Sequence, residues 1–159
     1  MTESIELIRK FQDHAPVDVV GLANELGMKV WTSMKLSDDI SGKLFKDEAL
    51  GGTSSYAIVV NGTHPEVRRR FTIAHEIAHF LLHRNDVGDG ISDNQFYRSN
   101  LSNKQETEAN KLAAEILMPH SLIKKLTTDN QLGNKDTKPL ANKLNVSEVA
   151  MKIRLGINF

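Results

Sequence analysis

The sequence contains no cysteine, and its 20 basic and 20 acidic side chains cancel to a formal net charge of zero. The absence of cysteine excludes a disulfide scaffold, a cysteine-ligated zinc ribbon and a thiol nucleophile. The absence of a basic excess argues against a protein whose main task is to neutralise nucleic-acid phosphates. Any metal site must therefore be built from nitrogen and oxygen ligands.

Long apolar runs are also missing. No segment approaches the roughly 20 apolar residues that span a bilayer, and the first residues carry acids and lack the apolar block of a secretory signal. We therefore expect a cytoplasmic protein without membrane contact. The length of 159 residues suits one domain with its own core. We expect a core over about 16–120 and a helical C-terminal extension over about 121–159.

Hydrophobic periodicity predicts a chain of mixed α and β structure. Two capping boxes, Thr63-x-x-Glu66 with a proline and Ser102-x-x-Gln105, indicate helix starts. The polar connection over 85–101 is long enough to be functional or mobile. The predicted helices are 1–14, a short one after Pro16, 63–84, 102–118 and two within 139–155; the predicted strands are 28–31 and 56–61, with a turn and hairpin edge over 37–48.

The strand over 56–61 has two interpretations. It could lie at the edge of the sheet, where an extended peptide substrate would add to it by β-augmentation. Its continuous apolar run is equally typical of a strand buried on both faces. Periodicity does not choose between them.

The predicted helix over 63–84 is apolar nearly all round, which indicates a central, buried helix. It carries His75-Glu76-Ile-Ala-His79. Residues four apart share one helix face, so the two imidazoles can bind one metal ion, and half of a tetrahedron stays open for a third ligand and a water. Glu76 lies about 100° around the helix, where it can take a proton from that water. Two buried histidines and a glutamate without partners would cost several kcal/mol, and a metal removes that cost.

The third ligand must come from another segment. A third histidine at position 85 is excluded, because that residue is Asn. The next helix offers Glu106 and Glu108, and the apolar periodicity of its inner face favours Glu106. The alternative for Glu106 is a solvated acid that stabilises the first turn.

Other polar residues near the motif have more ordinary explanations. His83 continues the series of histidines but lies about 12 Å along the axis from His75, so we expect a cation at a helix C-terminus rather than a ligand. Arg68 could reach a substrate, although a surface arginine is the simpler interpretation. If the metal-bound water attacks a carbonyl, a side chain is expected to help the metal stabilise the resulting oxyanion. The candidates are Arg68, Tyr56, Tyr97 and His83, and the sequence does not decide among them.

The two short helices within 139–155 have the spacing of a helix-turn-helix. From Lys135 to Phe159 there are five basic and two acidic residues, which is a small excess for binding DNA. Helical pairs of this kind often serve packing alone. The sequence therefore argues against DNA binding by this segment but does not exclude it.

Together, Arg70-Phe-Thr-Ile-Ala-His-Glu-Ile-Ala-His-Phe-Leu-Leu-His83 and Glu106-Thr-Glu-Ala-Asn-Lys-Leu-Ala-Ala-Glu-Ile-Leu-Met-Pro119 resemble the ImmA/IrrE family of metallopeptidases. The resemblance implies an α+β fold: a compact zincin-like (thermolysin-like) core with a small sheet, a buried H-E-x-x-H helix and a helix-turn-helix-like extension. It implies zinc (Zn²⁺) as cofactor, His75, His79 and Glu106 as ligands, with Glu108 the other candidate, and Glu76 as the catalytic residue.

The same resemblance implies a zinc endopeptidase that cleaves a helix-turn-helix repressor, in phage or mobile-element regulation, in stress responses or in a toxin–antitoxin-like pair. A different class of function stays open. The chain could be a zinc-stabilised module that binds DNA or a repressor through its C-terminal helices and cleaves nothing. Replacement of Glu76 by Gln separates the two hypotheses.

Overall fold

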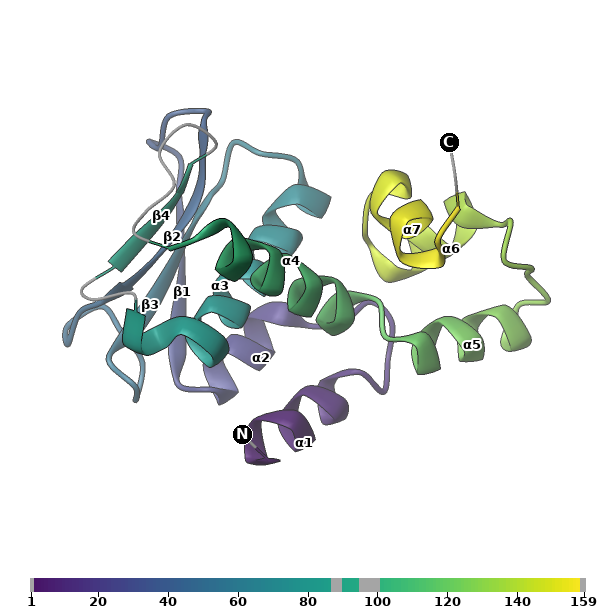
Figure 1. Ribbon diagram of the computed structural model, residues 1–159, viewed down its shortest axis with the longest axis horizontal. Coiled ribbons are helices and arrows are strands. Elements are labelled where there is room, and N and C mark those ends of the chain that lie inside the picture. Colours follow the sequence, from purple (N-terminus) through teal and green to yellow (C-terminus); the bar gives the residue numbers. More distant parts are fainter. Residues whose placement is uncertain (1, 87–89, 95–100, 158–159) are drawn as a thin grey trace.

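The computed structural model describes residues 2–86, 90–94 and 101–157 and confirms the α+β class. In Figure 1 a sheet lies on one side, α3 and α4 run through the centre, and α6 and α7 lie on the other side. The helices are α1 (Thr2–Phe11), α2 (Val19–Glu25), α3 (Glu66–His83), α4 (Asn103–Leu117), α5 (His120–Asp129), α6 (Thr137–Leu144) and α7 (Glu148–Leu155), with a 3₁₀ turn η1 (Arg84–Asp86); the strands are β1 (Met28–Ser33), β2 (Ile40–Lys46), β3 (Tyr56–Asn61) and β4 (Gly90–Asn94). None of the described helices is both long enough and apolar enough to cross a membrane.

The sheet has the strand order β1-β3-β2-β4. β3 pairs in parallel with β1 and antiparallel with β2, so both of its backbone edges are used. The possibility that residues 56–61 form an edge strand for a substrate is therefore wrong, and the alternative of a buried strand is confirmed. The edge predicted over 37–48 is also wrong, because β4 pairs along the free side of β2.

β4 lies within the connection 85–101, for which we predicted no regular structure. Its sequence, Gly-Ile-Ser-Asp-Asn, has no apolar alternation and gives no strand signal. Residues 87–89 and 95–100 of that connection lie outside the described residues, so the prediction that the connection is functional or mobile is not tested there.

α3 is central and buried, as its pattern predicted: Thr72 to Phe80 are all buried. Its start differs from the prediction. Pro65 occupies the N-cap without a side-chain hydrogen bond, and the Thr63 hydroxyl instead lies 2.6 Å from Asn61 Oδ1. The capping box at Thr63 is therefore wrong, and the helix begins three residues later because Thr63 belongs to the turn after β3.

α4 begins with the predicted capping box. The Ser102 hydroxyl accepts a hydrogen bond from the Gln105 backbone N–H, and the Gln105 side chain accepts one from the Ser102 N–H. Gln105 Nε2 also donates to Asp86 Oδ2 at 2.9 Å, which joins the start of α4 to the end of α3. The two helices therefore run antiparallel, and Glu106, in the first turn of α4, is fixed against α3.

This cap supports a testable prediction. Ser102→Ala should lower the free energy of unfolding by about 1 kcal/mol, because an N-cap acceptor is lost, and should also weaken metal binding, because Glu106 is in the turn that the cap holds. Ser147→Ala is the matched control, since Ser147 caps α7 through Ala150 N–H. Denaturant unfolding and metal titration should show a similar stability loss in both variants and weaker metal binding in Ser102→Ala alone. Equal metal affinity in the two variants would contradict the positioning of Glu106 by the cap.

The C-terminal helices contain one confirmed and one missed element. α6 and α7 form the predicted pair across a turn, with Asn145 in the left-handed region at φ 53°. α5 lies within the predicted helical extension over about 121–159 but was not predicted as a separate helix. The pair is fastened to the central helices by two arginines: Arg70 Nε donates to Asn145 O at 3.2 Å, and Arg154 Nε donates to Met118 O at 2.8 Å.

Candidate metal centre

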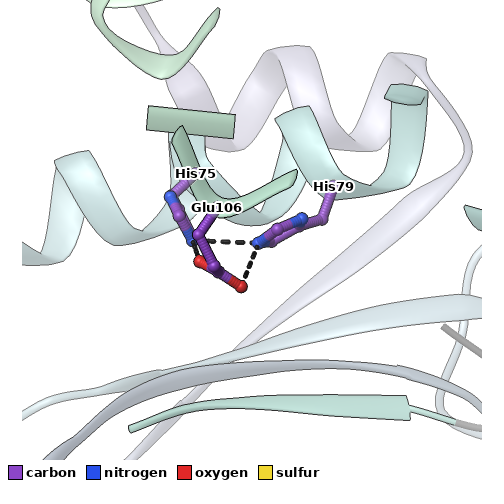
Figure 2. Close-up of side chains that lie close together, drawn as sticks. All are labelled: His75, His79 and Glu106. Carbon is purple, nitrogen blue, oxygen red and sulfur yellow. Dashed lines mark hydrogen bonds and ion pairs between the residues drawn. The ribbon is translucent and has the colours of Figure 1, made fainter. Parts of the chain in front are cut away.

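Three side chains converge between α3 and α4 (Figure 2). His75 and His79 come from successive turns of α3, and Glu106 comes from α4. His75 Nε2 and His79 Nε2 lie 3.0 Å apart, Glu106 Oε2 lies 3.2 Å from His75 Nε2, and Glu106 Oε1 lies 3.3 Å from His79 Nε2. These three residues could hold a metal ion.

The surroundings of Glu106 and His79 favour the protonation states in which these side chains bind metal ions. Burial alone would raise the pKa of Glu106, but hydrogen bonds and charge interactions with His75 and His79 outweigh it and hold the pKa of that carboxyl well below its usual range. Burial lowers the pKa of His79, with a smaller contribution from His75. Near neutral pH the cluster therefore presents an ionised carboxylate and a neutral His79 imidazole, which are the forms that ligate metal ions.

Glu76 is the most unusual residue beside the cluster. It is fully buried, and neither carboxylate oxygen has a hydrogen-bond partner among the described residues. A buried carboxylate in this condition is costly. Such a group, next in sequence to His75, makes Glu76 a candidate functional residue.

The structure separates the two acids of α4. Glu106 lies in the cluster, whereas the Glu108 side chain is 48% exposed and its Oε1 lies 3.5 Å from His83 Nε2. The helical periodicity that favoured Glu106 therefore agrees with the geometry.

His83 has a closer relation to the cluster than we expected. It lies at the C-terminal end of α3 as anticipated, but it is buried, and its Nδ1 lies 3.0 Å from His79 Nδ1. The expected place at the helix end is confirmed, whereas the contact with His79 was not expected. Spacing by four residues showed that the two histidines share a face, but not that the side chains touch.

The remaining candidates make other contacts or lie outside the described residues. Arg68 is exposed and donates a hydrogen bond to Ser41 Oγ at 3.2 Å, as a surface arginine would. Tyr56 is buried and packs edge-on against Phe80, with ring centroids 5.3 Å apart. Tyr97 lies outside the described residues.

The fold and this cluster together define an α+β protein with a buried two-histidine, one-glutamate group of metal-binding type. A family profile, Peptidase_M78, the IrrE N-terminal-like domain, matches residues 23–156. The chain belongs to this peptidase family, which confirms the resemblance drawn from the sequence.

Comparison with solved structures and curated sequences adds less. The fold is similar to that of a Mycobacterium tuberculosis transcriptional regulator, with a TM-score of 0.62 and 16% sequence identity over 97% of this chain. This chain spans 46% of that regulator's length, and at this identity the likeness concerns the fold alone. No curated protein matches the sequence significantly.

Proposed function

We propose that this protein is a zinc-dependent endopeptidase with a zincin-like core, and that His75, His79 and Glu106 hold the ion. The carrying observation is the spacing of the three donor atoms. A tetrahedral zinc ion with bonds of about 2.0–2.2 Å has ligand atoms about 3.3–3.6 Å apart. The donor atoms of His75, His79 and Glu106 lie 3.0, 3.2 and 3.3 Å apart, which is close to this ligand–ligand separation. Two histidines and a glutamate also form a ligand set typical of catalytic zinc in peptidases.

Zinc bound there would supply a Lewis acid that makes water more acidic and polarises a peptide carbonyl. The chain's own contribution is proton transfer by Glu76. Its unpaired carboxylate accepts a proton from the attacking water and delivers it to the amine that leaves, so that one peptide and one water give a carboxylate product and an amine. Burial keeps other hydrogen-bond donors away from the Glu76 carboxylate until the water arrives.

We further propose that the substrate is a helix-turn-helix repressor, in phage, mobile-element or stress-response control or in a toxin–antitoxin-like pair, which places the reaction in the cytoplasm. Membership of the M78 family supports the peptidase activity. The transcriptional regulator with a similar fold supports a link to the control of transcription. In this proposal residues 1–159 act as one metallopeptidase domain, and its C-terminal helices form a helix-turn-helix-like extension.

A second candidate is a zinc-stabilised module that binds DNA or a repressor through α6 and α7 without cleavage. The two helices across a tight turn favour it, and the balanced charge of the chain weighs against it.

One experiment distinguishes the two functions. The zinc-loaded protein is incubated with repressors of the helix-turn-helix class, and the products are analysed by mass spectrometry. Cleavage at a defined bond that stops with a chelator and returns with zinc supports the peptidase. Repressor binding without any cut, under conditions where zinc is bound, would contradict it.

The contact between His79 and His83 gives a further prediction. A metal-binding imidazole is oriented by the partner of its other nitrogen, and removal of such a partner costs about 10–100-fold in metal affinity. If His79 binds through Nε2, its Nδ1–H donates to His83 Nδ1. His83→Ala should therefore weaken zinc binding by about 10–100-fold, as measured by competition with a chromophoric chelator. His120→Ala, on exposed α5, is the control and should bind zinc as the wild type does. Unchanged affinity in His83→Ala would show that the contact does not orient His79.

A further inference from the structure

A groove of about 660 Å³ lies between the central helices and the C-terminal pair. One wall comes from the first half of α3, one from α4, and one from α7. The arginine contacts to Asn145 and Met118 described above hold the α6–α7 pair in place, so the third wall is fixed rather than loosely attached.

The groove lies about one helical turn from the candidate metal centre along α3 and α4. Four residues before His75 on α3 is Phe71, and four residues after Glu106 on α4 is Asn110; both line the groove. The Phe71 ring also stacks on the His75 ring, with centroids 6.5 Å apart and planes at 28°. Because four residues make about one helical turn, the groove begins about 5–6 Å from the ligands. An extended peptide covers that distance with about two residues.

The lining is apolar. It includes Val149 and Ile153, which are 54% and 67% exposed although they are large aliphatic side chains. Exposed apolar surface gathered in one concave place, with a polar rim, is typical of a binding site rather than of an ordinary surface.

The charged side chains that line the groove all have the same sign. Arg68, Lys111 and Arg154 line the groove, and no carboxylate does so among the described residues. In a chain with zero net charge this is a local excess of positive charge. It is complementary to a ligand that carries both apolar and acidic side chains.

We propose that this groove is a substrate subsite that binds a segment of a protein substrate rich in apolar and acidic residues, beginning about two residues from the bond at the metal centre. The proposal rests on the peptidase function and deepens it. The apolar side chains of the segment fill the space between α4 and α7, and its Asp or Glu side chains pair with Arg68 and Lys111. A nucleic acid would satisfy the cations but would leave the apolar walls exposed to water.

The test uses binding, which does not depend on cleavage. Three labelled peptides of about ten residues, long enough to reach from the metal centre across the groove, are compared by fluorescence anisotropy with the zinc-loaded Glu76→Gln protein. One combines leucine with glutamate, one leucine with lysine, and one serine with glutamate. The first should bind at least tenfold more tightly than each of the other two.

Variants of groove residues test whether the peptide binds in the groove. The double charge reversal Arg68→Glu with Lys111→Glu should remove the preference for glutamate over lysine, and Ala150→Trp, which fills the groove, should weaken binding at least tenfold. Lys125→Glu on α5 reverses an exposed charge away from the groove and should leave binding unchanged. Circular dichroism and zinc content identify variants that fail to fold.

Equal binding of the three peptides, no binding, or a preference unchanged in the double variant would overturn the proposal. So would tighter binding of a DNA duplex, or a dimer in light scattering that Ala150→Trp dissociates. Selective binding with no cleavage by the wild-type protein would instead contradict the peptidase function and leave the groove assignment standing.

Discussion

Glu76→Gln should reduce peptide cleavage by about three orders of magnitude while zinc stays bound. Glutamine has nearly the same shape but cannot accept the proton of the attacking water, and a general base contributes about 10²–10⁴-fold to a rate. The same change should not destabilise the metal-free protein, because it replaces a buried carboxyl group that has no hydrogen-bond partner in the described structure. The melting temperature of the metal-free variant should therefore equal or exceed that of the wild type.

Glu115→Gln on α4 is the matched control, and it should leave both activity and melting temperature nearly unchanged. The measurements are initial cleavage rates per bound zinc and thermal unfolding in a chelator. Cleavage within tenfold of the wild-type rate would show that Glu76 is not the base. A large fall in stability of the metal-free variant would show that its carboxylate has a structural role instead.

The second large effect concerns the two acids of α4. Glu106→Gln should weaken zinc binding by at least about 100-fold, because it removes the negative charge that lies 3.2 and 3.3 Å from the two imidazoles. A ligand that binds the folded state stabilises it by RT ln(1 + [L]/Kd). At free zinc of 100 times the wild-type Kd, the stabilisation should fall from about 2.7 kcal/mol to about 0.4 kcal/mol.

Glu108→Gln is a matched control two residues away, with a half-exposed side chain outside the cluster. It should keep zinc affinity within about threefold of the wild type. Unfolding with and without zinc measures both variants. A larger loss of zinc affinity in Glu108→Gln than in Glu106→Gln would show that Glu108, and not Glu106, is the third ligand.

The sequence predicted the grouping of His75, His79 and Glu106 better than it predicted the sheet. A spacing of four residues on one helix determines that His75 and His79 share a face, and this local rule needs no tertiary information. Glu106 required only that a second amphipathic helix turn its apolar face inward, which capping by Ser102 and the following pattern indicated. The contacts with His83 depend on side-chain orientation across one turn, which spacing alone does not determine.

The errors in the sheet have a physical cause. A buried strand such as Tyr56–Asn61 has the same apolar run whether its neighbours lie on one side or on both, so its place in the strand order depends on distant pairing. β4 has no strand-forming pattern and is held by backbone pairing with β2. The groove beside the site also depends on distant contacts, because Arg70 and Arg154 bring the C-terminal helices to α3 and α4.

The proposed zinc centre can be measured directly by X-ray absorption spectroscopy at the zinc edge of the metal-loaded protein. We expect one zinc per chain with two imidazole nitrogens and oxygen ligands at about 2.0–2.2 Å, and no sulfur, since the chain has no cysteine. Glu106→Gln should change this spectrum or lose the metal, and Glu108→Gln should do neither. Zinc with a different number of imidazoles, or a spectrum that Glu106→Gln leaves unchanged, would contradict the proposed His75, His79 and Glu106 centre.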